Sequence, residues 1–219
     1  MARPTQKTTL YIGYDPMCAF CWAFRPTWAS IQAELAQDKT RPIQIVSLLG
    51  GLAPDSDEPM PTEMQTKISG IWRYIEEKIP GTRFNHDYWQ KQQARRSTYP
   101  SCRAVMAAKM LDTQLEDRMT LAVQQAYYLN ALNPSNDDTL IDCAVSIGLN
   151  KTAFIEQYQS HACDLAFQEE MAQCRSLGIN SFPSLVLSKD TLRFNIPIDY
   201  NHASKVLNDI RQVNAHLDA

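Results

Sequence analysis

The sequence predicts an α/β fold in which a long helical block interrupts a small β-sheet. Strand-like segments occur near the two ends of the 219-residue chain, whereas residues from about 61 to 178 show mostly helical periodicity. The resulting order is β-α-β, a run of helices, then β-β-α. We therefore expect one discontinuous α/β domain at residues 1–55 and 179–219, with a helical insertion domain at residues 56–178.

The N-terminal segments predict a β-α-β unit. Residues 8–14 are rich in Thr, Tyr and Ile and end at Asp15-Pro16, which favours a short strand. A helix is expected next, from the apolar stripe formed by Phe24, Trp28, Ile31 and Leu35. Residues 43–49 then form a buried strand that we expect to run parallel to the first.

The helical block contains three segments whose limits can be predicted. Apolar spacing over residues 115–129 predicts one helix. Asp137 and Asp138 are expected to cap a second. Asn150 should cap a third, which continues to about residue 178.

Strand signals return after this block. Residues 183–188 predict a strand, Lys189-Asp190 a tight turn, and residues 191–195 its hairpin partner. An apolar stripe over residues 203–217 predicts a final amphipathic helix. Together these segments complete the β-β-α end of the fold.

Composition and charge argue against two classes of partner. The formal net charge is −3 at pH 7, and no run of lysine or arginine marks a surface for nucleic acid or membrane. The longest apolar-rich run, residues 43–53, is too short to span a bilayer. No apolar stretch of signal-peptide length follows the first residues. We expect a cytoplasmic protein that binds neither nucleic acid nor membrane.

The motif Cys18-Ala19-Phe20-Cys21 directly follows the first predicted strand and begins the first helix. Free amides and partial positive charge at a helix N-terminus favour a thiolate there. One helical turn separates the two sulfurs, so they can close a small disulfide. We predict that Cys18 is the attacking thiolate and that Cys21, flanked by Trp22, is the resolving thiol.

Two other interpretations of this cysteine pair stay open. Structural zinc needs four ligands, and the nearest further pair, His161 and Cys163, is a weak candidate. The two cysteines could also be ordinary core residues. We favour redox chemistry and expect no bound metal. The remaining cysteines, expected to be buried and inert, are Cys102, Cys143, Cys163 and Cys174.

Two segments resemble the DsbA family, in its cytosolic FrnE-like branch. Residues 15–26 resemble the family's active-site segment through the Asp-Pro before the motif, the Trp after it and the proline that follows. Residues 178–186, which include Phe182-Pro183, resemble its cis-proline loop and the following strand. The order of elements is also similar over nearly the whole chain. The resemblance implies a thioredoxin-like fold with a large all-helical insertion.

The same resemblance implies a thiol–disulfide oxidoreductase. In the family, the residue before the cis-proline lies against the disulfide and its backbone pairs with a bound peptide, a role that carries over to Phe182 and Pro183. Phe20 would complete this apolar substrate platform. The implied partners are protein or small-molecule disulfides and thiols. No cofactor is expected, although glutathione is a candidate co-substrate.

The chain departs from the periplasmic oxidases of the family between its two cysteines. Those proteins carry a histidine there, whereas Ala19 and Phe20 can supply neither charge nor hydrogen bond to a thiolate. Asp15 adds a negative charge that disfavours the Cys18 thiolate, unless helix capping uses it. We predict a couple that is less oxidising than DsbA, with the poise of a reductase or isomerase.

The segment that contains Cys102 and Arg103 also resembles the related cytosolic proteins. In this fold the insertion covers the active-site face. One interpretation is that Cys102 or Arg103 reaches the site as an accessory residue, beside Asp15 and Trp22. The other is burial in a helix, which is common for free cysteines.

Two further classes of function compete with a redox enzyme. Glutathione-dependent isomerases and transferases of the kappa and hydroxychromene-carboxylate types have a similar fold, but they carry a serine where Cys18 stands. A binding module without catalysis is the third class, since fold alone does not give function. The sequence leaves open the physiological substrate, the direction of electron flow, the reducing partner and the oligomeric state.

Overall fold

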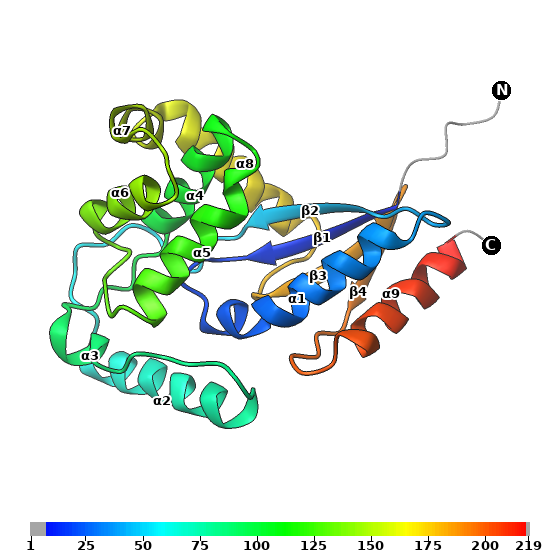
Figure 1. Ribbon diagram of the computed structural model, residues 1–219, viewed down its shortest axis with the longest axis horizontal. Helices are drawn as coiled ribbons and strands as arrows, with labels where there is room; N and C mark the ends of the chain where they lie inside the picture. Colours follow the sequence, from blue (N-terminus) through cyan, green and yellow to red (C-terminus); the bar gives the residue numbers. More distant parts are fainter. Residues whose placement is uncertain (1–7, 218–219) are drawn as a thin grey trace.

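The computed structural model describes residues 8–217, which form a four-stranded β-sheet with a block of helices at one end (Figure 1). The strands are β1 (Thr9–Tyr14), β2 (Gln44–Leu49), β3 (Ser184–Lys189) and β4 (Leu192–Ile196). Their order in the sheet is β2-β1-β3-β4. β1 runs parallel to β2, and β3 runs antiparallel to β1 and to β4. The pairing of β1 with β3 brings the segments before and after the helical insertion together.

The helices fall into three groups. α1 (Ala19–Gln37) and α9 (Ala203–Leu217) lie side by side along one face of the sheet (Figure 1). The other helices lie between β2 and β3 in sequence: α2 (Thr62–Lys78), α3 (Tyr88–Lys91), α4 (Tyr99–Leu111), α5 (Leu115–Tyr128), α6 (Asp137–Ser146), α7 (Lys151–Tyr158) and α8 (His161–Ser176). Helices α4 to α8 form the block, and α2 with α3 form an arm (Figure 1). The predicted α/β class with a large helical insertion is confirmed. Its division into two domains at residues 55 and 178 stays a prediction.

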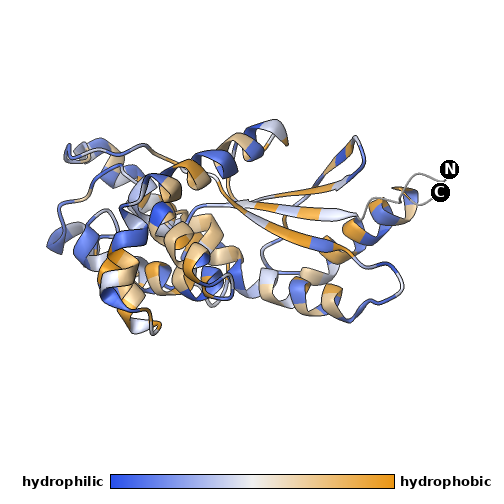
Figure 2. Ribbon diagram, turned by 90° about the horizontal axis from the view of Figure 1, so that it is seen from above, coloured by the Kyte–Doolittle hydropathy of each residue, from blue (hydrophilic) through white to orange (hydrophobic). Residues whose placement is uncertain are grey.

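Both faces of the two central strands are covered. Leu10, Ile12, Leu185 and Leu187 pack with α1 and α9 in one core. The intervening Val186 joins the end of α8 in a second core. This separation follows from the alternation of successive side chains between the two faces of a sheet. Figure 2 shows hydrophobic residues along the strands, whereas hydrophilic residues alternate with them around the flanking helices.

Helix α4 is the centre of the helical block. Its small side chains Cys102, Ala104, Ala107 and Ala108 are fully buried. Small residues let α5, α7 and α8 approach α4 closely, and all three contact it. Within residues 8–217, no helix is long and apolar enough to cross a bilayer.

An aromatic cluster fixes the α2–α3 arm to the end of α5. The indole of Trp72 is almost fully buried and lies 4.9 Å from Phe84 and 5.5 Å from Tyr128, measured between ring centroids. Trp22 of α1 stacks on Tyr128 at 5.8 Å. The arm is therefore coupled to the first turn of α1, where the cysteine motif lies.

The helix predicted from Asn150 to about residue 178 is in fact two helices. Asn150 does cap α7, because its side chain accepts a hydrogen bond from the Ala153 amide at 3.0 Å. Ser160 then accepts one from the Cys163 amide at 3.1 Å and starts α8. A serine that can satisfy a free amide ends one helix and begins the next, although the apolar spacing continues across it.

Two smaller predictions were also wrong. Asp137 and Asp138 do not cap α6; they lie in its first turn, after the N-cap residue Asn136. Negative charge is still favourable there because it faces the positive end of the helix dipole. The hairpin turn lies one residue later than predicted, at Asp190 and Thr191, and Asp190 has a positive φ of 54°.

The Trp72 cluster predicts where the arm is vulnerable. Trp72→Ala should lower the free energy of unfolding by about 3–5 kcal/mol, because it removes a large buried ring and leaves a cavity. The control is Tyr74→Ala on the same helix, where the side chain is 53% exposed; it should change stability by about 0.5 kcal/mol or less. Urea unfolding followed by circular dichroism measures both, and equal effects would contradict the anchoring role of Trp72.

Candidate functional site

The two cysteines of the motif lie at the start of α1, directly after β1. Cys18 is the N-cap residue, and its Sγ accepts a hydrogen bond from the Cys21 amide at 3.3 Å. The Cys18 amide in turn donates to the Asp15 carbonyl at 3.0 Å. Both residues are free thiols and both are buried, with 5% and 7% of their surface exposed. Sulfur thus occupies the place where a capping oxygen usually satisfies the helix amides.

The loop before β3 closes over Cys18. The Phe182–Pro183 peptide bond is cis, and the Cys18 thiol donates to the Phe182 carbonyl at 3.3 Å. Two glycines make room for this loop: a Cβ atom on Gly13 or Gly50 would collide with Ile179 or the Phe182 ring, respectively. Residues far apart in sequence therefore meet at one sulfur atom.

The surroundings of Cys21 disfavour the thiolate form of its side chain. Burial raises the pKa of the Cys21 thiol well above its ordinary value, and its interactions with Cys18 and the charge of Asp15 raise it further. A thiol in such surroundings stays protonated near neutral pH. Cys21 therefore needs a proton acceptor before it can act as a nucleophile.

Asp15 is a fully buried carboxylate held by uncharged donors. The donors are the amides of Met17 (2.7 Å) and Leu52 (2.8 Å), the Thr98 hydroxyl (2.7 Å) and the Cys102 thiol (3.5 Å). Burial raises the pKa of Asp15, and these hydrogen bonds oppose that rise. The carboxylate does not cap α1, whose N-cap is Cys18. It fastens the loop before the motif to the segment after β2 and to the start of α4.

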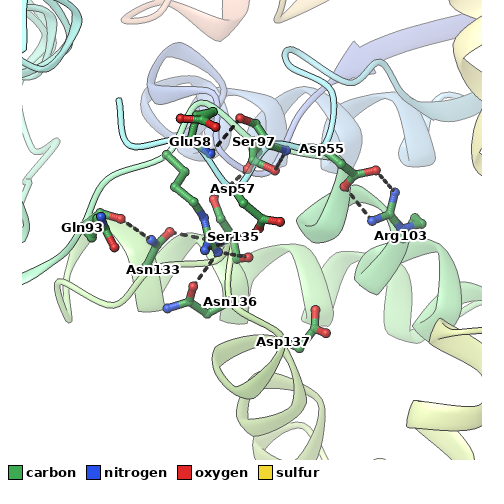
Figure 3. Close-up of polar contacts among 12 residues, drawn as sticks. Asp55, Asp57, Glu58, Gln93, Ser97, Arg103, Asn133, Ser135, Asn136 and Asp137 are labelled. Atoms are coloured by element: carbon green, nitrogen blue, oxygen red, sulfur yellow. Dashed lines mark hydrogen bonds and ion pairs between the residues drawn. The ribbon is translucent and has the colours of Figure 1, made fainter. Parts of the chain in front are cut away.

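Cys102 and Arg103 are adjacent in sequence but point to different places. Cys102 is fully buried and contacts Asp15, so its thiol touches the loop that carries the motif without reaching the surface. Burial, with the nearby Asp15 charge, raises the pKa of Cys102 well above its ordinary value. Arg103 instead makes two hydrogen bonds to Asp55, at 2.7 and 2.9 Å, in a polar region beside Ser135 and Asp137 (Figure 3). The structure therefore does not bring Arg103 to the cysteine pair.

Phe20 and Trp22 anchor the first turn of α1 on two sides. Phe20 is partly buried, and its ring lies 5.9 Å from Tyr200. The Trp22 indole donates to the Arg83 carbonyl at 3.1 Å and stacks on Tyr128. Phe20, like Phe182, packs against the hydrophobic cluster that contains both cysteines.

Sequence reasoning missed three polar residues near the site. Thr98 holds Asp15, and Tyr14 with Glu116 lines a cavity of about 220 Å³ that also includes Cys21 and Pro183. Thr98 and Glu116 belong to the insertion, and no spacing rule connects them to the motif at Cys18, which lies 80 and 98 residues earlier. Among residues 8–217, no group of three or more His, Cys, Asp or Glu side chains is arranged to hold a metal.

Comparison with known proteins gives a matching family model and two relatives in sequence. A family model described as thioredoxin matches residues 11–205. The chain is 25% identical over 183 residues to the ClpXP adapter protein SpxH of Halalkalibacterium halodurans, covering 84% of this chain and 59% of that protein. SpxH of Shouchella clausii is 23% identical over 197 residues, 86% of this chain and 61% of that protein. The chain thus spans about three fifths of the length of these relatives.

Three solved structures share the fold. A proposed protein disulfide isomerase from Nitrosomonas europaea has a TM-score of 0.84 at 22% identity, covering 96% of this chain and 99% of that one. The cytosolic disulfide reductase DsbM of Pseudomonas aeruginosa with GSH has a TM-score of 0.70 at 21% identity and covers 96% and 100%. The oxidoreductase DsbA of Xylella fastidiosa has a TM-score of 0.63 at 13% identity and covers 99% and 89%.

These likenesses agree with the architecture described above: a sheet of order β2-β1-β3-β4, helices on both of its faces, and a helical insertion between β2 and β3. The predicted fold class, a thioredoxin-like α/β fold with a DsbA-like helical insertion, is confirmed. The family model covers most of the chain, from β1 to the first turn of α9. The chain therefore belongs to the thioredoxin family.

Proposed function

We propose that this protein is a thiol–disulfide oxidoreductase that cycles Cys18 and Cys21 between a dithiol and a disulfide. The observation that carries the proposal is the placement of Cys18. Its sulfur caps α1, accepts the Cys21 amide and lies 3.3 Å from the Phe182 carbonyl. A helix N-terminus favours the anionic form of a group placed there. The names of the structural neighbours, a disulfide isomerase, a disulfide reductase and DsbA, support the same chemistry.

The exchange proceeds in two steps. The Cys18 thiolate attacks one sulfur of a substrate disulfide, forms a mixed disulfide and releases the first substrate thiolate. Cys21 then loses its proton and attacks the Cys18 sulfur. The Cys18–Cys21 bond forms as the bond to the substrate breaks. The enzyme loses two electrons and two protons, and the substrate gains them as two thiols.

Phe182, Pro183 and Phe20 form the proposed substrate platform. Phe182 and Phe20 are partly buried and pack on the cluster that contains the cysteines. The substrates would be protein or small-molecule disulfides and thiols. The DsbM structure with GSH supports glutathione as a co-substrate, and its description as cytosolic supports a cytoplasmic location.

We further propose a reducing or isomerising poise. Ala19 and Phe20 offer no charge to a thiolate, and Asp15 is a buried carboxylate whose charge raises the pKa of Cys21. Poorly stabilised thiolates make the reduced form of a cysteine pair less stable than the reduced form of DsbA. Such a pair is oxidised more easily and therefore gives up electrons more readily.

A binding role is the second candidate, because both curated relatives are named as adapter proteins. Such a role would not depend on either sulfur. The glutathione-dependent isomerases carry a serine in place of Cys18. This chain has both cysteines of the pair, so we do not favour that class of function.

The principal test is reduction of insulin disulfides by glutathione or dithiothreitol. Cys18→Ser and Cys21→Ser should each lower turnover by about a hundredfold or more, because each removes one sulfur of the couple. Cys21→Ser should also accumulate a mixed disulfide at Cys18, which mass spectrometry detects. Cys174→Ala is the control, because Cys174 is a buried cysteine near the end of α8, in a different core cluster from the cysteine pair. A wild-type protein without exchange activity would favour the adapter role instead.

The buried charge of Asp15 predicts a shift in redox potential. Asp15→Asn should make the couple more oxidising, by roughly 30 mV for each tenfold gain in the stability of the reduced form. Burial raises the pKa of Asp15, so the wild-type carboxylate becomes neutral at a higher pH than an ordinary aspartate. The wild-type and variant potentials should therefore converge as the pH falls through that pKa.

Equilibration with glutathione at several pH values gives both potentials. Asp57→Asn removes the same charge from a fully exposed side chain and should have no effect. A potential that does not change in Asp15→Asn would contradict the predicted poise.

The close packing of the Phe182 ring on Gly50 predicts that a larger residue at position 50 impairs substrate binding. A Cβ atom there would overlap the Phe182 ring, so Gly50→Ala should displace the loop that faces Cys18. We expect kcat/KM for insulin reduction to fall about tenfold, which corresponds to about 1.4 kcal/mol. Gly70→Ala, in α2 with open space around it, should leave kcat/KM unchanged. Equal kcat/KM values in the two variants would argue against the platform.

A further inference from the structure

Three segments surround the first turn of α1 and form a rim around the proposed redox site. One is the loop before β3, whose Phe182 carbonyl accepts the Cys18 thiol. Another leads from β4 to α9 and places the ring of Tyr200 5.9 Å from Phe20. The third is the turn at residues 79–86, directly after α2. A substrate that reaches the Cys18 sulfur enters among these three segments.

The turn after α2 is joined to the start of α1 through Trp22. The Trp22 amide donates to the Cys18 carbonyl at 3.0 Å, so the two residues lie one turn apart on the same face of the helix. The Trp22 indole donates to the Arg83 carbonyl at 3.1 Å. Figure 1 shows the end of α2 below the start of α1. Arg83 is exposed, and its long side chain therefore lies at the rim beside Cys18.

The charge of Arg83 is the one on this rim that has no ion-pair partner in the part of the chain that the structure describes. In the same turn, the His86 ring contacts Glu76 at 3.0 Å. Between β4 and α9, Asp199 is paired with Lys205 at 3.0 Å. The loop before β3 contains no charged residue. The rim therefore presents an uncompensated positive charge to the solvent.

This charge differs in sign from most of the molecule. Residues 62–96, which contain the α2–α3 arm, carry seven lysines and arginines against four aspartates and glutamates, whereas the whole chain carries 21 against 24. Cys18 attacks as an anion in the proposed exchange, and the buried carboxylate of Asp15 lies in the loop that precedes it. A disulfide that carries carboxylates is repelled by both charges. A cation at the rim offsets this repulsion.

We propose that Arg83 selects disulfides that carry a carboxylate close to the sulfur, by pairing with that carboxylate while Cys18 attacks. The inference rests on the proposed oxidoreductase function and names its substrate class. The bonds change as in the exchange described above: the Cys18–substrate bond forms, the substrate disulfide breaks, and the carboxylate itself is unchanged. Two sources share this chemistry. One is a small acidic disulfide, and the other is a protein with an acidic residue beside its cysteine.

Three small disulfides of similar size separate the effect of charge from that of reactivity: dithiodipropionate is anionic, hydroxyethyl disulfide is neutral and cystamine is cationic. Each is mixed with the reduced protein in about 0.1 M salt, and acid quenching with mass spectrometry follows the loss of reduced protein. Arg83→Gln should slow the anionic reagent about fivefold, accelerate the cationic one about fivefold and change the neutral one less than about twofold. The ratio of variant to wild type, taken for each reagent, cancels differences in intrinsic reactivity.

Two control variants and added salt test whether the effect belongs to a charge at position 83. Arg83→Lys keeps the charge and should keep the preference of the wild type. Lys67→Gln removes a positive charge from an exposed residue of α2, eleven residues before the helix ends at Lys78. That spacing is about 16 Å along the helix axis, beyond the Debye length of about 10 Å in 0.1 M salt, so all three rates should stay unchanged. Raising the salt to about 1 M should remove most of the wild-type preference.

Peptides distinguish the two sources of the carboxylate. A peptide disulfide with a glutamate beside each cysteine is compared with the same peptide carrying lysine there. If Arg83→Gln lowers the preference for the glutamate peptide as it does for the small anionic reagent, acidic protein segments belong to the substrate class. If the preference is confined to the small reagents, the substrate class is small acidic disulfides.

Two results would overturn the proposal. One is an Arg83→Gln variant whose rates, relative to the wild type, are the same for all three small reagents. The other is an equal change in Lys67→Gln, which would assign the preference to the charge of the whole arm. A wild-type protein that none of the reagents oxidises would instead contradict the oxidoreductase function on which the inference rests. Circular dichroism of each variant separates these results from a failure to fold.

Discussion

The buried carboxylate of Asp15 is the constraint on which the site depends. An ionised group in the interior is tolerated only when hydrogen bonds replace the water that it loses. Here the donors come from the loop before the motif, from the segment after β2, from Thr98 just before α4 and from Cys102 in α4. Because the Asp15 carbonyl also accepts the Cys18 amide, any shift of these segments moves the N-cap sulfur. The geometry of Cys18 is therefore set by the contact between sheet and insertion, and not by the helix alone.

The insertion consequently does more than cover the sheet. Its helix α4 carries Cys102 and Lys109, its helix α5 carries Glu116, and Thr98 immediately precedes α4. The aromatic cluster around Trp72 fixes the α2–α3 arm against the same first turn of α1 through the Trp22–Tyr128 stack. The polar and apolar contacts reach the motif from different directions. The strand–helix unit supplies the two sulfurs, and the insertion supplies much of their electrostatic environment.

The sequence predicts the features that depend on neighbouring residues and misses those that depend on contacts between distant ones. The strands, α1, α9 and the placement of Cys18 at a helix start are local features, and periodicity and spacing located them within a residue or two. The break at Ser160 was missed because apolar spacing continues across it, whereas a single cap hydrogen bond decides it. The partners of Asp15 and the cavity beside Cys21 were missed because they join residues 37 to 102 positions apart. No pattern in one sequence encodes such pairings.

The two cysteines differ in their surroundings, and this difference bears on the order of events. Cys18 donates to the Phe182 carbonyl and accepts a hydrogen bond from the Cys21 amide at the start of α1. A substrate that pairs with the loop would enter where that carbonyl lies. Cys21 instead lines the cavity bounded by the sheet, α1 and α5. In the proposed exchange, a substrate would therefore reach the pair at Cys18, whereas Cys21 faces the space on the side of the insertion.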